Sequence, residues 1–279
     1  MSQTSSPPPE PTASPQPRWD PAQYQRHSRA RSRALTELVA RVPALPAAPR
    51  IADLGCGPGA PSTLLFERWP DARVTGYDNS PEMLAEARRV TAPAGGTLDF
   101  VEADLAGWHP GQPPDLIVAN AALQWVPEHW RLLPGWIDAL APGGVIAFQV
   151  PGNFAAPSHR LMREIADRPR WRARLAGVLR ATDPVLTPAG YLAELAPHCA
   201  AVDVWETTYL HRLTGEDPVL DWVRGTGLRP VLTALADEPA ELAAFLADYR
   251  AALRVAYPAG EHGTVFPFRR IFAVGTRAR

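Results

Sequence analysis

Ile51-Ala-Asp-Leu-Gly-Cys-Gly-Pro-Gly59 is the stretch of sequence that decides the fold. Its first half is apolar and has the length of a buried strand, whereas its second half carries glycines at every other position. The apolar spacing from Ser62 to Trp69 then predicts a helix. Glycine adopts positive φ and lets a ligand approach the backbone closely, so a strand, a glycine-rich turn and a helix in this order predict a cofactor cradle.

The composition of the chain narrows the classes of partner. Lysine and arginine together number 28 against 29 aspartates and glutamates, so no surplus of basic charge points to nucleic acid or an anionic membrane. Cys56 and Cys199 have neither the number nor the spacing for a disulfide framework or a metal site. No apolar stretch is long enough to span a bilayer, and the N-terminus lacks a signal-peptide pattern. We therefore expect a cytoplasmic monomer or weak homo-oligomer that acts on a small molecule without a metal.

Short apolar runs alternate with helical segments in the first half of the chain, which predicts a parallel sheet covered on both faces. Two later strands, at 201–210 and 264–275, are expected to add an antiparallel edge. The predicted fold class is α/β: a Rossmann-like, doubly wound, mostly parallel seven-stranded sheet with an antiparallel edge strand and a helical cap over the ligand site. The expected boundaries are a disordered Pro/Ser-rich tail at 1–18 and a single domain at 19–279, with its core at 45–150, 200–212 and 263–276 and its cap at 151–199 and 216–258.

Two acidic residues at predicted strand ends indicate which cofactor the cradle holds. Asp78 ends the second strand, about twenty residues after the glycine turn, where a carboxylate suits a ribose diol. Asp104 ends the third strand and is placed to accept a hydrogen bond from an adenine amino group. The spacing G-C-G-P-G departs from the dinucleotide pattern, and the absence of lysine excludes a Walker-type P-loop. An adenosine-containing cofactor is therefore predicted, with a nicotinamide dinucleotide as an open alternative.

The run D53-L-G-C-G-P-G59, Asp78, E102-A-D104 and A119-N-A-A-L-Q-W125 together resemble the motifs of class I S-adenosylmethionine-dependent methyltransferases. The resemblance implies S-adenosylmethionine as the cofactor, with its methionine part at the glycine turn, its ribose at Asp78 and its adenine at Asp104. The cofactor-binding residues that it implies are Tyr24, Arg33, Asp53, Gly55, Cys56, Gly57, Gly59, Asp78, Asn79, Met83, Asp104, Leu105, Asn120, Ala121 and Trp125.

Further segments from Trp19 to the C-terminus resemble the trans-aconitate 2-methyltransferase family. They are W19-D-P-x-x-Y24, R31-S-R33, H159-R-L-M-R-E164, W205-E-T-T-Y209, D221-W-V-R-G-T-G-L-R-P230 and F268-R-R-I-F272. This resemblance implies methyl transfer to a carboxylate of trans-aconitate or a close polycarboxylate, giving a monomethyl ester and S-adenosylhomocysteine. A carboxylate is already ionised at neutral pH, so no acid or base residue is expected and the site has only to position the reactants.

The remaining carboxylates of such an acceptor need arginine forks, for which Arg33, Arg229 and Arg270 are favoured over other arginines such as Arg163. A surface ion pair is the alternative role for each. The residues expected to bind the acceptor are Tyr24, His27, Trp125, Gln149, His159, Trp222, Arg229 and Arg270. Two other functions stay open: a methyltransferase of the same fold acting on another small molecule, and a non-catalytic module that binds S-adenosylmethionine.

Overall fold

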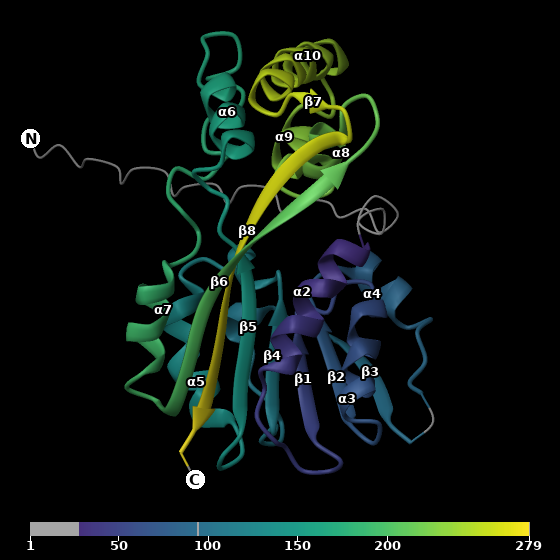
Figure 1. Cartoon of the computed structure of the whole chain (residues 1–279), viewed down its shortest axis with the longest axis vertical. Coiled ribbons are helices and arrows are strands. Elements are labelled where there is room, and N and C mark those ends of the chain that lie inside the picture. Colours follow the sequence, from purple (N-terminus) through teal and green to yellow (C-terminus); the bar gives the residue numbers. More distant parts are fainter. Residues whose placement is uncertain (1–27, 94, 279) are drawn as a thin grey trace, which may run out of the picture.

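The computed structural model describes residues 28–93 and 95–278, so the expected tail, Tyr24 and His27 lie outside the described residues. An eight-stranded sheet has the order β3-β2-β1-β4-β5-β8-β6, with the short strand β7 paired to β8 beside this path. β1 to β5 are parallel to one another, which confirms the predicted α/β class (Figure 1). The strands are β1 (Arg50–Leu54), β2 (Arg73–Asp78), β3 (Thr97–Glu102), β4 (Leu116–Asn120), β5 (Val145–Pro151), β6 (Cys199–Leu213), β7 (Ala259–Gly260) and β8 (Gly263–Arg277).

The strand that runs antiparallel to the parallel set is β8, and it lies inside the sheet. It pairs with β5 on one side and β6 on the other, so β6 forms the edge. The two late strands thus form the antiparallel edge that the sequence predicts, and β8 takes the inner place because its apolar run Ile271 to Val274 is buried throughout. Most side chains of β6 keep contact with solvent. A strand that is apolar on both faces is stabilised most in the sheet interior.

Helices cover both faces of the sheet, as a doubly wound fold requires. The alternation within β5 shows the division, because Val145 and Ala147 join one apolar cluster and Ile146 and Phe148 join the other. The helices α2 (Ser28–Ala40) and α3 (Leu65–Arg68) belong to the cluster of Val145 and Ala147 and cover one face. The helices α5 (Leu133–Ala139) and α7 (Pro188–Leu195) belong to the cluster of Ile146 and Phe148 and cover the other face.

The segments that follow β1 and β2 set the geometry of the cradle. A 3-10 turn (Ala60–Leu64) precedes α3, so the helix predicted from Ser62 to Trp69 is regular only over its middle. After β2, the hydroxyl of Ser80 accepts a hydrogen bond from the Met83 amide at 3.2 Å and begins α4 (Pro81–Ala87), as the sequence predicts.

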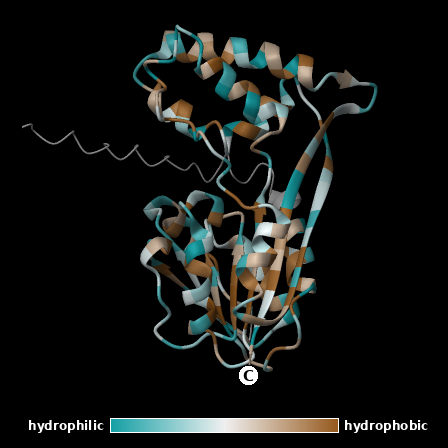
Figure 2. Ribbon diagram, turned by 90° about the vertical axis from the view of Figure 1, so that its left-hand side faces the viewer, coloured by the Kyte–Doolittle hydropathy of each residue, from teal (hydrophilic) through white to brown (hydrophobic). Residues whose placement is uncertain are grey.

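A separate helical cap stands beyond the carboxyl ends of the parallel strands. The outer halves of β6 and β8 extend past the sheet as a two-stranded ribbon and reach the cap (Figures 1 and 2). The cap has an apolar core of its own, in which Trp171, Trp222, Phe245 and Tyr249 are buried. Its helices are α6 (Pro157–Ala166), α8 (Pro218–Arg224), α9 (Arg229–Ala234) and α10 (Pro239–Ala256).

Helix α7 departs from the expected cap boundary. Its side chains Tyr191 and Leu195 are fully buried in the cluster that contains Trp136 and Phe148, so α7 packs on the sheet and not in the cap. The Tyr191 hydroxyl lies 2.7 Å from Nε2 of His129, which ties α7 to the segment before α5.

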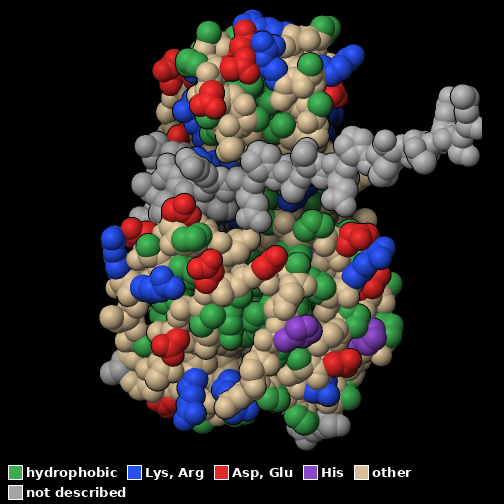
Figure 3. Space-filling model, turned by 180° about the vertical axis from the view of Figure 1, so that it is seen from behind, with side chains coloured by type: hydrophobic (Ala, Val, Ile, Leu, Met, Phe, Trp, Pro, Cys, Tyr) green, Lys and Arg blue, Asp and Glu red, His purple; other side chains and the backbone are tan. Residues whose placement is uncertain are grey.

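None of the described helices is both long and apolar enough to cross a membrane. On the face shown in Figure 3, acidic and basic side chains are interspersed over cap and body.

Candidate active site

Two adjoining pockets lie at the carboxyl ends of the parallel strands. The smaller, of about 240 Å³, is lined by the glycine turn and the ends of β2 and β3, and the larger, of about 770 Å³, lies between body and cap. Asn79, Ala121, Trp125 and Pro127 line both, so the two pockets adjoin along these shared residues. This is the edge of an open α/β sheet at which ligands bind.

The glycine turn forms the floor of the smaller pocket. Gly55 has φ of +72°, and a Cβ atom there would lie 2.2 Å from Cβ of Ala122, so any side chain would clash with the next loop. Gly57 has φ of +57° and faces open space, and its amide donates to Oδ2 of Asp78 at 2.9 Å. Gly59 begins the 3-10 turn and packs against Phe100. The turn thus exposes backbone to the pocket at Gly57, as a cofactor cradle requires.

Asp78 connects the turn to the start of α4. Its Oδ1 accepts from the Ser80 amide at 2.9 Å, while Oδ2 accepts from Gly57. Burial raises the pKa of Asp78, and the backbone hydrogen bonds from Ser80 and Gly57 oppose that rise. Each carboxylate oxygen can accept a second hydrogen bond, so the pair is suited to the two hydroxyl groups of a ribose.

The other end of the smaller pocket is formed by Asp104, Leu105 and Met83. Asp104 is exposed and its Oδ1 accepts from the Ala106 amide at 3.0 Å, which orders the short turn that follows β3. Buried Met83 and Leu105 supply apolar surface beside this carboxylate. A flat apolar base whose amino group reaches Asp104 fits this end.

Asp53 and Cys56 lie behind the turn and are not among the residues that line either pocket in the described part of the chain. Asp53 is 5% exposed and accepts a hydrogen bond from the Ser62 hydroxyl at 2.6 Å. Burial raises the pKa of Asp53 to about 6, with the Asp78 charge adding to the rise and the Ser62 hydrogen bond opposing it. The Cys56 thiol is buried and its pKa is raised by burial, so the thiol stays protonated.

Ala121 lies in the wall between the pockets in a strained conformation. Its φ is +56°, which is unusual for a residue with a side chain. Its amide donates to the Gln149 carbonyl at 3.0 Å, and its own carbonyl accepts from Nε2 of Gln124 at 2.6 Å. The hydrogen bonds of its amide and its carbonyl hold Ala121 in this conformation. Strained backbone that is held by its surroundings is typical of functional sites.

A buried chain of polar side chains runs beside this wall. Gln149 is fully buried, and its amide joins Asn120 at the end of β4 to Arg270 in β8. Arg270 is 2% exposed and also lines the larger pocket. The sequence places Gln149 in contact with the acceptor, but in the structure it lies behind the pocket wall and contacts the two residues on either side.

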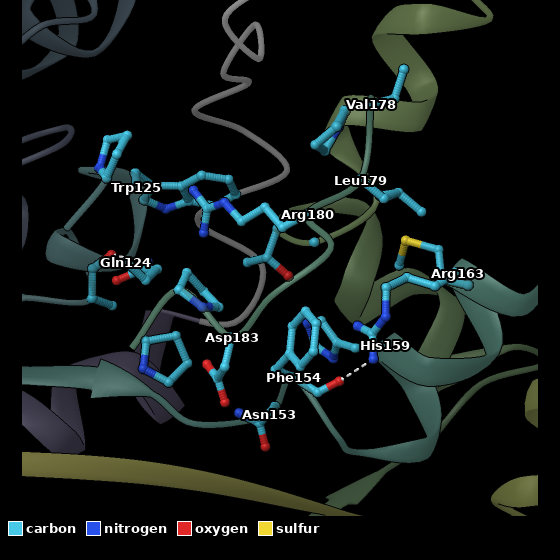
Figure 4. Close-up of a pocket in the computed structure, with 18 of the residues that line it drawn as sticks. Gln124, Trp125, Asn153, Phe154, His159, Arg163, Val178, Leu179, Arg180 and Asp183 are labelled. Atoms are coloured by element: carbon cyan, nitrogen blue, oxygen red, sulfur yellow. Dashed lines mark hydrogen bonds between the residues drawn. The ribbon is translucent and has the colours of Figure 1, made fainter. Parts of the chain in front are cut away.

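The larger pocket contains several of the side chains that the sequence assigns to the acceptor. Trp125, His159, Trp222 and Arg270 line it, and Figure 4 shows Trp125 and His159 on either side of the cavity. Burial lowers the pKa of His159 to about 4, so this imidazole is neutral at pH 7. It therefore contributes a neutral hydrogen-bonding group and no charge.

Two favoured arginines do not reach the pockets. Arg33 has a side chain that is 66% exposed, and it pairs with Glu37 on α2 at 2.7 Å. Arg229 is not among the lining residues, although its neighbours Gly227 and Pro230 are. Sequence position alone does not show which residues of a helix face a pocket, either for α2 on the sheet or for α9 in the cap, and this explains both differences.

Arg163 and Arg180 line the larger pocket instead (Figure 4). Arg163, which the sequence offers as a less favoured candidate, lies over the Phe154 ring at 3.7 Å and donates to the Phe154 carbonyl. Arg180 belongs to the irregular segment between α6 and α7, where no periodicity marks it. In the smaller pocket, sequence reasoning also misses Ala106, Ala122, Val126 and Pro127, each of which directly follows a motif or another lining residue.

Comparisons with known proteins agree with this geometry. The family model described as "Methyltransferase domain" matches residues 51–144. A trans-aconitate 2-methyltransferase of Streptomyces coelicolor is 64% identical over 264 residues, covering 94% of this chain and 87% of the relative. The chain belongs to the trans-aconitate 2-methyltransferase family. A second member, from Streptomyces avermitilis, is also 64% identical and covers 92% of this chain and 96% of that protein.

A solved structure agrees at the level of the fold. The S-adenosylmethionine-dependent methyltransferase of Thiobacillus denitrificans, in complex with S-adenosylhomocysteine, superposes with a TM-score of 0.51 at 18% identity and covers 91% of this chain and 97% of its own. As a member of the trans-aconitate 2-methyltransferase family, this chain is an enzyme that uses S-adenosylmethionine. The smaller pocket fits that cofactor, because an exposed glycine backbone lies beside carboxylates at the ends of two adjacent strands.

Proposed function

We propose that this enzyme transfers the methyl group of S-adenosylmethionine to a carboxylate of trans-aconitate, forming a monomethyl ester and S-adenosylhomocysteine. Two relatives that are 64% identical over most of this chain carry the name trans-aconitate 2-methyltransferase. One structural observation supports the proposal most directly: the pocket with the glycine turn shares Ala121 and Trp125 with the arginine-lined pocket under the cap. A methyl donor in the first would therefore meet an anionic acceptor in the second.

The residues proposed to hold the cofactor are those of the smaller pocket. Asp78 would bind the ribose hydroxyl groups, Asp104 with Leu105 the adenine, and the glycine turn at Gly55 and Gly57 the methionine part. When bound, S-adenosylmethionine supplies an electrophilic methyl group on a sulfonium with a good leaving group. The negative charge of Asp53 behind the turn favours the positive amino group of the methionine part.

The protein itself has to orient the acceptor and remove water from it. A free carboxylate titrates near pH 4 and is already a nucleophile at neutral pH, so no residue needs to abstract a proton. Three arginines, Arg163, Arg180 and Arg270, line the larger pocket against two carboxylates, Glu82 and Asp183. The apolar rings of Trp125 and Trp222 shield the same space from solvent. Orientation of this kind is worth up to about 7–11 kcal/mol in well-aligned intramolecular reactions.

The proposal is tested with purified enzyme, S-adenosylmethionine and trans-aconitate. We expect S-adenosylhomocysteine and a product with one added methyl group, and alkaline hydrolysis should return trans-aconitate because the new bond is an ester. A panel with phenols, amines and other carboxylic acids identifies the alternative acceptor. If trans-aconitate is inert while another class is methylated, the proposed acceptor is wrong although the methyltransferase assignment stands.

We also propose that the enzyme works in the cytoplasm as a monomer or weak homo-oligomer. Its two cysteines, Cys56 and Cys199, are free thiols, which fits a reducing compartment. The nearly balanced charge gives no reason to expect a nucleic-acid partner. Light scattering across a range of protein concentrations tests the oligomeric state.

A further inference from the structure

Arg180 differs from three other arginines of the segment that leads from α6 to α7. Arg168, Arg170 and Arg174 each pair with an acidic side chain of α10 or of the residue before it, at 2.6 to 2.8 Å. Their partners are Asp248, Glu241 and Glu238. Arg180 has no ion pair with any residue in the described ranges 28–93 and 95–278, and its side chain turns toward the pocket (Figure 4).

The guanidinium of Arg180 is held in place by an aromatic ring. Its Cζ lies 4.9 Å from the centre of the Trp125 ring, a distance at which cation and ring attract each other. Trp125 is one of the residues that line both pockets. Arg180 therefore lies near the junction where an acceptor meets the methyl donor, and the ring fixes its position without using its hydrogen-bond donors.

The surroundings of Arg180 favour the arrival of an anion. Arg180 is exposed to solvent, yet partial burial of its guanidinium lowers its pKa. An arginine stays protonated at neutral pH despite such a shift, so a positive charge without an ion pair among the described residues faces the cavity. Asp183 is the carboxylate nearest to Arg180 in the chain among the residues that line the pocket. It forms no ion pair within the described residues.

We infer that Arg180 binds a carboxylate of the acceptor that is not methylated, and that this pair selects for a polycarboxylate. This inference rests on the proposed function. A forked guanidinium binds a carboxylate through two parallel hydrogen bonds, which fixes orientation as well as position. The bound carboxylate is a non-reacting one, because charged hydrogen bonds from a guanidinium draw electron density from both oxygens and weaken them as nucleophiles. Arg180 is thus a specificity-determining residue, brought to the site by the segment between α6 and α7.

The test compares Arg180→Gln with the wild type on trans-aconitate and on three dicarboxylates that each lack a different one of its carboxylates. Mesaconate lacks the carboxylate of the methylene arm, itaconate that of the alkene carbon, and 3-methylglutaconate the central one. The acceptor KM and the inhibition constants of the analogues are measured together with the dissociation constant of S-adenosylhomocysteine. Arg174→Gln, which removes a paired arginine from the same segment outside the pocket, is the matched control.

We expect Arg180→Gln to raise the KM for trans-aconitate by about tenfold or more, the effect of losing a charged hydrogen-bonded pair. Two analogues should lose affinity by a similar factor, and the analogue that lacks the carboxylate bound by Arg180 should lose none. Arg180→Lys should recover part of the loss, because it restores the charge but not the fork. Affinity for S-adenosylhomocysteine and all constants of Arg174→Gln should stay near the wild-type values.

Two results would overturn the inference. One is an unchanged KM for trans-aconitate in Arg180→Gln, and the other is an equal loss of affinity for all three analogues, which would indicate a general structural or electrostatic effect. Either result leaves the proposed function intact as long as the wild type methylates trans-aconitate. Failure of the wild type to do so counts against the proposed function itself.

Discussion

Gln149 donates a hydrogen bond from Nε2 to Oδ1 of Asn120 at 2.7 Å, and the direction of this bond fixes which way the Asn120 amide faces. On its other side, Gln149 accepts from Nη1 of Arg270 at 3.0 Å. A guanidinium can only donate, so the Gln149 oxygen must face Arg270 and its NH₂ group must face Asn120. The Nδ2 end of Asn120 is thereby turned away from Gln149, and Asn120 directly precedes Ala121, which lines both pockets.

Gln149→Glu should reverse the Asn120 amide while preserving a partner for Arg270. A carboxylate has no hydrogen to donate, so Asn120 must turn Nδ2 toward position 149 and point Oδ1 away from it. The reversal replaces a hydrogen-bond donor by an acceptor directly before Ala121, which lines both pockets, and we expect kcat to fall by about tenfold or more. The dissociation constant of S-adenosylhomocysteine, measured by calorimetry, should change by less than about threefold.

Gln149→Met is the control for this substitution, because it keeps the volume and removes both hydrogen bonds. It leaves the Asn120 amide free to adopt either orientation, so its loss of turnover should be smaller than that of Gln149→Glu. Equal losses in the two variants would show that only the packing at position 149 matters.

Asp78→Asn should weaken cofactor binding with little effect on the fold. The amide keeps one oxygen to accept a backbone hydrogen bond from Gly57 or Ser80, but it removes the charge and half of the acceptors for a ribose diol. Loss of charged hydrogen bonds predicts a rise of about tenfold or more in the dissociation constant of S-adenosylhomocysteine. Asp99→Asn changes an exposed carboxylate of the neighbouring strand β3 and is the matched control. Equal affinity in Asp78→Asn and the wild type would remove Asp78 from the ribose role.

Removal of the charge should leave the acceptor KM unchanged at Arg33 and raise it at Arg270. Arg33 is paired with Glu37 on the helix surface, so Arg33→Gln should leave both KM values unchanged and cost about 0.3–0.5 kcal/mol of stability at most. Arg270 lines the larger pocket and lies over the Phe268 ring at 4.9 Å, so Arg270→Gln should raise the acceptor KM. Steady-state kinetics with each substrate varied separately measures both. A larger effect of Arg33→Gln on the acceptor KM would show that Arg33 reaches the site during turnover.

The smaller pocket could be predicted from the sequence because its residues are close in the chain to strand ends. Gly57, Asp78 and Asp104 each follow an apolar run, and the carboxyl ends of parallel strands necessarily meet at one edge. The place of β8 inside the sheet could also have been inferred, since the run Ile271 to Val274 has no polar alternation. Local pattern and topology together determine this half of the site.

The lining of the larger pocket could not be predicted in the same way. Which arginine faces the cavity depends on how the cap packs on the body, and this packing joins residues that are far apart in the chain. Arg229 lies next to lining residues and still misses the pocket, whereas Arg180 reaches it from an irregular segment without a motif. The assignment of α7 failed for the same reason, because Tyr191 and Leu195 contact the sheet through residues distant in sequence.

Asp53→Asn should make the free enzyme more stable at neutral pH and a weaker binder of its cofactor. The pKa of Asp53 is raised by burial to about 6, above its value in the unfolded chain, so the folded protein holds this proton more tightly. The contribution of Asp53 to stability is therefore fully present below about pH 4 and lost as the pH rises through about 6, a difference of up to about 3 kcal/mol. The amide of the variant cannot ionise, so urea unfolding at pH 4.5 and 8 should show a flatter pH dependence than in the wild type.

The same substitution separates the charge of Asp53 from its packing. The amide oxygen can still accept the hydrogen bond from Ser62, which preserves the local structure. Affinity for S-adenosylmethionine should fall nevertheless, since the charge that favours the methionine amino group is gone. A variant that keeps the wild-type pH dependence of stability would show that another group, such as Asp78, carries this titration.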